Sequence, residues 1–274
     1  MRRARTWWTL AGVAVVVWAL LPALWIVSLS LKSPDEIGLA PRFLPQQPTW
    51  ENYRAVFATS LFTAALRNSI GVALVATLLA VSVASAAAYA VARLDFPGRR
   101  LLLVVALAIA MFPQAALISP LFDMWRSAGL YDTWPGLVIP YLTFALPLAI
   151  WTMTAFFRQI PWELEQAAQV DGATPWQAFR KVIVPLAAPG VFTTAILTFF
   201  FCWNDFLFAI ALTSTDRSRT VPAALAFFTG ASQYQSPVTA IAAASVVVTV
   251  PVVVLVLLFQ RRIVAGLTAG AVKG

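Results

Sequence analysis

The chain has 274 residues, of which 61% are hydrophobic and 11% are charged, and its mean hydropathy is +0.82. These values lie far outside those of soluble globular domains, so they indicate an integral membrane protein. The single cysteine and the lack of histidine argue against a disulfide framework and against a zinc or other cysteine-based metal site.

Long stretches without Asp, Glu, Lys or Arg mark the membrane spans, because a helix needs about 20 mostly apolar residues to cross a bilayer. We predict a single all-α domain over residues 1–274 with six transmembrane helices. The spans are expected at residues 7–31, 68–92, 101–122, 135–157, 187–212 and 238–260. The last apolar stretch begins near Thr220 and could cross twice, but Pro222, Gly230 and a polar run interrupt its first half, so it is assigned one crossing.

The distribution of charge predicts the orientation. Six crossings with the N-terminus inside place a basic excess equal to the whole net charge of +8 on the inner side and leave the outer side neutral. We therefore expect a multi-pass cell-membrane protein with both termini in the cytoplasm, and nucleic acid is not needed as a partner. Arg2, Arg3 and Arg5 also suit a signal peptide, but the apolar run after them is longer than a signal core, so we expect a retained span.

The segments before the fifth span carry mainly packing signals. A proline-rich outer segment contains a predicted short surface helix near residues 50–57, and the second span is rich in alanine and serine, which favours close helix packing. The third and fourth spans contain several prolines. Proline in a membrane helix frees carbonyl groups that need other partners, so these helices are expected inside a bundle or along a cavity, although kinks also occur in purely structural spans.

A polar insert at residues 158–185 separates the fourth and fifth spans. Pro161 suits the first position of a helix, and Gly172 suits the left-handed residue that ends it. Thr174 is then expected to cap a second helix, with Pro175 at its first position. The insert is thus predicted to be two short helices joined by a sharp bend.

Each of the two helices has an apolar face. Leu164, Ala167 and Ala168 make the first face nearly flat, and the bulkier Trp176, Phe179 and Ile183 form a ridge on the second. Such a pair suits insertion into a groove on a soluble partner. The alternative is an amphipathic hairpin that lies on the lipid headgroups.

Three later segments hold further candidates. Trp203, Asn204 and Asp205 place a carboxylate among aromatic residues at the end of the fifth span, which indicates either a functional polar site or an interface belt. The outer loop, 213–237, contains an uncharged polar run that also suits a plain connection. The tail, 261–274, has too many small residues to form a stable helix alone.

The insert resembles the EAA loop of ABC importer permeases, and its run DGATPWQAF is similar to the maltose-permease branch of carbohydrate importers. The resemblance extends over the whole chain and implies the type I importer permease fold with a cytoplasmic coupling-helix loop. The residues that it assigns to contact with the ATPase are Glu165, Gln166, Ala167, Ala168, Asp171, Gly172, Trp176 and Phe179. One residue departs from the family, because Gln166 stands where a glutamate precedes the two alanines; Gln166 keeps a hydrogen bond but not the charge.

The resemblance also implies roles outside the insert. The run WNDFL is similar to a feature of sugar permeases, which places Trp203, Asn204 and Asp205 near the sugar path. In such permeases the outer loop reaches the binding protein, here through Gln233, Tyr234 and Gln235, and the tail enters the ATPase interface, here through Gly270, Val272 and Lys273.

The partners follow from the same resemblance. They are a second homologous permease, two ATPase subunits, an external sugar-binding lipoprotein, the sugar and membrane lipid. The chain contains no G-x-x-x-x-G-K-[ST] sequence, so ATP and Mg²⁺ are expected on the ATPase, with no cofactor, metal or catalytic residue in this chain.

The runs YAVARLDFPG, GLYDTWPGL and FQRRIVAGLT are similar to mycobacterial trehalose-importer permeases, which makes trehalose the expected solute. The alternatives are another di- or oligosaccharide, an ion-coupled secondary carrier, or a membrane scaffold. A secondary carrier usually has an ionisable group near the middle of the membrane, whereas these spans are almost free of central charges.

Overall fold

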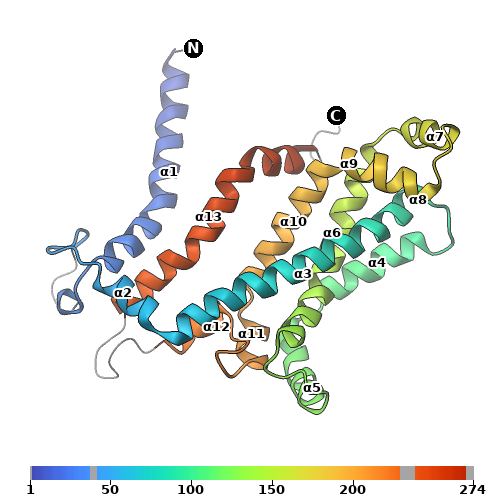
Figure 1. Cartoon of the computed structure of the whole chain (residues 1–274). Coiled ribbons are helices and arrows are strands. Elements are labelled where there is room, and N and C mark those ends of the chain that lie inside the picture. The colour runs from blue at the N-terminus through green and yellow to red at the C-terminus, as the bar shows by residue number, and fades with distance from the viewer. Residues whose placement is uncertain (1, 38–41, 229–237, 270–274) are drawn as a thin grey trace. The chain divides into compact units, whose positions relative to one another are not determined.

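A computed structural model describes residues 2–37, 42–228 and 238–269, and within these ranges all regular structure is helical. The chain divides into two compact units, Met1–Thr63 with Ala224–Val252 and Ala64–Ala223 with Val253–Gly274, which are described separately. In chain order the helices are α1 (Arg2–Ser30), η1 (Pro34–Glu36), α2 (Glu51–Ala58), α3 (Ser60–Arg93), α4 (Arg99–Ala110), α5 (Gln114–Ser127), α6 (Trp134–Gln159), α7 (Trp162–Val170), α8 (Pro175–Ala178), η2 (Phe179–Ile183), α9 (Val184–Leu186), α10 (Ala188–Trp203), α11 (Leu207–Leu212), α12 (Val221–Ala226) and α13 (Val238–Ala269) (Figure 1).

The first unit contains the short helix predicted near residues 50–57, which the structure confirms as α2. Its Asn52 is buried rather than at the surface, and the amide donates hydrogen bonds to the carbonyl oxygens of Ser30 at 2.9 Å and Lys32 at 2.8 Å. The hydroxyl groups of Tyr53 and Ser30 lie 2.7 Å apart. These contacts fix α2 to the end of α1 because a helix end leaves carbonyl groups without partners in the helix.

Four helices of the described residues are long and apolar enough to cross a membrane: those at Trp7–Ser30, Ser60–Arg93, Trp134–Gln159 and Val238–Gln260. Two bent helix pairs raise the total to six if each pair is one span. The fold is therefore that of an all-α membrane protein.

The third and fifth predicted spans are not continuous helices. The third is broken into α4 and α5, which meet at 86°. Pro113 lies at the break as the residue before α5, where a proline ring does not have to fit into a preceding turn. The fifth span ends as α10 at Trp203, and α11 follows only after Asp205 and Phe206. Sequence hydropathy missed the first break because Met111, Phe112 and Pro113 are apolar, and it missed the second because apolar helices flank the polar residues Asn204 and Asp205.

Helix α6 is the central helix of the second unit and packs against α4 and α10. Pro140 within it cannot donate to the carbonyl oxygen of Gly136, and the indole nitrogen of Trp125 donates to that oxygen instead, at 2.7 Å. This confirms that a proline-freed carbonyl is satisfied by packing. On α10, a Cβ atom at Gly190 would lie 2.3 Å from Cγ of Phe156, so only glycine permits this approach of α10 to α6.

Candidate functional site

The predicted corner of the insert lies between α7 and α8, beyond the end of α6 (Figure 1). Gly172 has φ of +89°, and its N–H donates to the carbonyl oxygen of Gln169 at 3.0 Å. The N–H of Ala173 donates to the carbonyl oxygen of Ala168 at 2.9 Å. This hydrogen-bond pair ends the helix in the way typical of a left-handed glycine, which confirms the bend.

The second helix begins as predicted. The N–H of Gln177 donates to Oγ1 of Thr174 at 3.3 Å, and the N–H of Thr174 donates to Oε1 of Gln177 at 2.8 Å, so the two residues form a capping box with Pro175 between them. The expectation for Pro161 was wrong by one position, because it caps α7 rather than starting it. The rigid corner is therefore encoded by residues close together in the sequence.

After α8 the helix widens into the π-helical turn η2. Pro185 follows this turn, and in a regular α-helix its ring would collide with the carbonyl group of Lys181. A π-helical turn moves that carbonyl away and leaves the chain helical. A second bend of 75° separates this segment from α10.

A buried charged cluster joins the insert to the last turns of α3. The side chains of Arg93 and Glu165 are 5% and 3% exposed, and Nε of Arg93 lies 3.7 Å from Oε2 of Glu165. The hydroxyl of Tyr89 donates to Oε1 of Glu165. Arg93 also donates to the carbonyl oxygen of Ile160 at 2.7 Å, and its guanidinium lies over the Trp162 ring, 5.0 Å from the centroid. We call Arg93, Glu165 and Tyr89 the latch.

An aromatic core lies beside the latch. The Phe179 ring packs 4.7 Å from that of Tyr89 and 6.3 Å from that of Phe157, and Ile183 is fully buried in the same cluster. Phe179 and Ile183 therefore do not form one exposed ridge with Trp176, which is 63% exposed. The rings of Trp176 and Phe179 still pack together, with centroids 5.3 Å apart, so the prediction was wrong about the exposure of Phe179 and Ile183.

The remaining insert candidates divide by exposure. Leu164 is 42% exposed on the predicted flat face, where Ala167 is exposed and Ala168 is half-buried. The exposed surface of the corner also includes Gln166, Asp171 and Gly172. Glu165 faces inward, so Gln166 rather than a carboxylate is presented at this position.

The structure separates the three candidates at the end of α10. Trp203 is buried and stacks on Phe199, with ring centroids 5.5 Å apart. Asp205 is also buried, and its Oδ2 accepts from the hydroxyl of Tyr141 at 2.9 Å and from the N–H of Ala209 at 3.1 Å. Only Asn204 is exposed. The other predicted sites, Gln233, Tyr234 and Gln235 of the outer loop and Gly270, Val272 and Lys273 of the tail, lie outside the described residues.

Sequence reasoning missed Asp132, which holds the segment after α11. Its Oδ1 accepts from the N–H groups of Ser214 at 2.9 Å and Thr215 at 3.1 Å and from the hydroxyl of Ser218 at 2.7 Å. Burial raises the pKa of Asp132, but the hydrogen bonds outweigh it and leave the pKa below its ordinary value. Its left-handed backbone, with φ of 57°, is a conformation that aspartate tolerates in turns.

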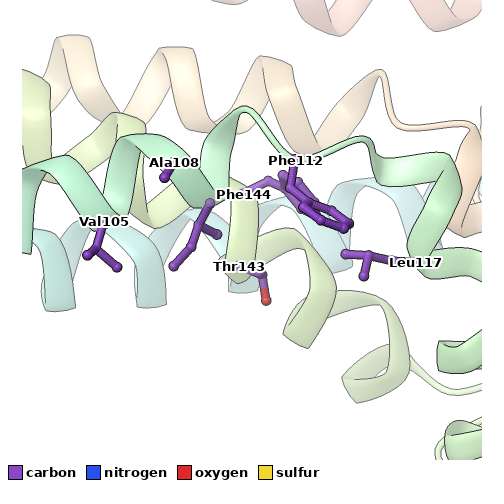
Figure 2. A pocket seen from close by; sticks show the side chains of 7 residues that line it. Val105, Ala108, Phe112, Leu117, Thr143 and Phe144 are labelled. Carbon is purple, nitrogen blue, oxygen red and sulfur yellow. The ribbon is translucent and has the colours of Figure 1, made fainter.

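A cavity of about 370 Å³ lies between α4, α5 and α6 (Figure 2). It is lined by Val105, Ala108, Ile109, Phe112, Leu117, Thr143 and Phe144. Thr143 supplies the one side-chain oxygen in this lining, and that hydroxyl donates to the carbonyl oxygen of Ile139 at 3.2 Å. A sugar needs several polar partners, so this apolar cavity does not suit one.

Comparison with known proteins gives concordant matches. The model of the family "Binding-protein-dependent transport system inner membrane component" matches residues 80–265. The chain is 58% identical over 272 residues to the trehalose transport system permease protein SugB of Mycobacterium tuberculosis, with 99% of each chain covered. It is 39% identical over 267 residues to the trehalose/maltose transport system permease protein MalG of Thermococcus litoralis, with 97% of this chain and 95% of that one covered.

The fold also has a solved counterpart. It is a chain in the crystal structure of a bacterial ABC transporter that is involved in the import of the acidic polysaccharide alginate. The TM-score is 0.78 at 24% identity, over 95% of this chain and 98% of that one. The likeness shows a shared fold.

Proposed function

Since this chain belongs to the family of binding-protein-dependent transport system inner membrane components, we propose that it forms half of the pore of an ATP-driven importer for trehalose. The observation that carries the substrate is the 58% identity, over 99% of both chains, to a trehalose permease. The other half of the pore is a second, related permease. An external sugar-binding lipoprotein delivers the sugar.

The insert is the surface on which a separate ATPase docks. The corner around Asp171 and Gly172 is exposed, and the exposed Trp176 lies beside it. This protruding surface combines polar and apolar groups and fits into a groove on the ATPase. The rigid caps at the corner support this role, because a part that transmits movement must not bend. Closure of the two ATPase subunits moves the insert and opens the translocation pore outward, and hydrolysis resets the pore. ATP and Mg²⁺ bind on the ATPase.

We assign different parts to the three candidates at the end of α10, Trp203, Asn204 and Asp205. Asn204 is the exposed candidate for contact with sugar hydroxyl groups, while Trp203 and Asp205 hold the chain around it. The outer loop and the tail keep their expected contacts with the binding protein and the ATPase. Both termini lie in the cytoplasm, because this orientation puts the excess of basic residues on the cytoplasmic side of the membrane.

Uptake of labelled trehalose by cells with and without the gene tests the substrate, and uptake that persists undiminished without the gene rejects trehalose. An excess of unlabelled maltose or diacetylchitobiose separates trehalose from other oligosaccharides. Uptake that follows an ion gradient and needs no ATPase subunit favours the secondary carrier.

Docking is tested with the assembled complex in lipid. Gly172→Ala places a side chain at φ of +89°, which costs about 1 kcal/mol and disturbs the corner. We expect ATP hydrolysis stimulated by the loaded binding protein to fall severalfold. Gly98→Ala is the matched control, because Gly98 has φ of +91°, has equally open space and lies outside the insert. Equal loss in both variants, or in neither, contradicts docking at this corner.

A further inference from the structure

We propose that Arg93 is a positioning residue, which holds the docking insert on the end of α3 through the latch and is required for the binding protein's signal to reach the ATPase. The inference rests on the proposed function, because it assumes that the insert docks on an ATPase. It concerns how the insert is held within this chain. It gives Glu165 a role inside this chain in place of direct contact with the ATPase.

Arg93 contacts three points at the start of the insert. Its guanidinium donates to the carbonyl oxygen of Ile160, lies over the ring of Trp162 and faces the carboxylate of Glu165 one turn further along α7. These partners come from the backbone, an aromatic face and an acidic side chain. A planar guanidinium can serve all three at once, whereas an ammonium group is a single point charge.

The cluster is nearly closed to solvent. Tyr89 covers Glu165 from the turn of α3 that precedes Arg93, and its ring also contacts Phe179 beyond the corner. The latch and this ring contact therefore connect both arms of the insert to the same two turns of α3.

A buried ion pair rarely exists for stability alone, because desolvation of the two charges offsets their attraction. Removal of one partner leaves an unpaired buried charge, whereas replacement of both by apolar residues often keeps the fold. This distinction separates a positioning role from a merely structural one. The double variant Arg93→Met with Glu165→Leu is expected to assemble. Its insert would lose the polar contacts that fix its position on α3.

The experiment uses the complete complex in lipid vesicles and measures assembly together with ATP hydrolysis, with and without trehalose-loaded binding protein. We expect the double variant to assemble at wild-type yield and to lose at least about fivefold in the stimulated-to-basal ratio. Tyr89→Phe and Arg93→Lys keep the packing and the charge, respectively, and are expected to lose about twofold to threefold in that ratio. Arg100→Met is the control, because Arg100 is exposed and lies outside the latch.

A wild-type ratio in the assembled double variant overturns the inference. If that variant does not assemble, a wild-type ratio in both Tyr89→Phe and Arg93→Lys overturns it instead. The proposed function has its own contradicting results. They are a wild-type complex whose ATP hydrolysis is not stimulated by the loaded binding protein, or a Gly172→Ala variant in which the stimulated ATP hydrolysis is unchanged.

Discussion

Asn204 and Asp205 are neighbours in sequence, but their side chains meet different surroundings. The Asp205 carboxylate is enclosed and accepts hydrogen bonds from Tyr141 and from the backbone of α11. Asn204 is exposed, and its amide donates to the carbonyl oxygen of Phe200 at 2.8 Å. The pair therefore separates a buried polar residue with partners inside the chain from an exposed one.

Substitution of Asp205 is expected to lower the stability of the subunit, whereas substitution of Asn204 is expected to lower trehalose uptake. Asp205→Ala leaves a buried hydroxyl and a buried N–H without their acceptor, which costs about 1–3 kcal/mol, so the thermal midpoint of the purified subunit falls. Asn204→Ala leaves that midpoint unchanged and lowers trehalose uptake. Asp205→Asn keeps one acceptor oxygen and serves as the milder control. Wild-type uptake by Asn204→Ala places Asn204 off the sugar path.

Among the elements, α6 shows how a helix accommodates proline at membrane depth. Trp125 of α5 supplies the hydrogen bond that Pro140 cannot make, so the proline position is coupled to the packing of another helix. At η2, Pro185 is accommodated by a wider turn within the same helix. The first solution needs a tertiary partner and the second does not.

This coupling gives a double-variant prediction. Trp125→Phe keeps an aromatic ring but orphans the carbonyl group of Gly136, so it destabilises the subunit by about 1–3 kcal/mol. Pro140→Ala supplies an N–H that can bond to the same carbonyl. We therefore expect the double variant to be less destabilised than the sum of the single variants, as measured by thermal unfolding in detergent. Additive effects disprove the coupling.

For the whole molecule, the orientation in the membrane rests on the charge distribution, and chemical labelling can test it. Cys202 is the only cysteine and is buried, so Cys202→Ala gives a background without reactive thiols. In that background, Gln169→Cys in the insert is expected to react with a membrane-impermeant maleimide only in opened cells. Arg217→Cys, on an exposed loop after α11, is expected to react in intact cells. Reversed labelling refutes cytoplasmic termini.

Local signals in the sequence were sufficient for much of the site. Gly172 and the Thr174–Gln177 box act on their own backbone, so the corner was predictable from a few adjacent residues. Hydropathy located the apolar stretches, yet it joined α4 to α5 because a bend between apolar helices leaves hydropathy unchanged. It also joined α10 to α11, because apolar helices flank the polar residues Asn204 and Asp205. The helix of the last span, α13, continues to Ala269, because a long helix carries small residues that could not form one alone.

The sequence by itself determined the membrane class, the family resemblance and the rigid corner, because composition, motif and helix caps act over short distances along the chain. Only the tertiary structure decided that Glu165 turns inward to Arg93, that Phe179 is buried, and that Asp205 is enclosed. Each of these outcomes depends on which distant residue shares a buried volume. A charge removed from water must find its partner there, and spacing along one helix does not reveal that partner.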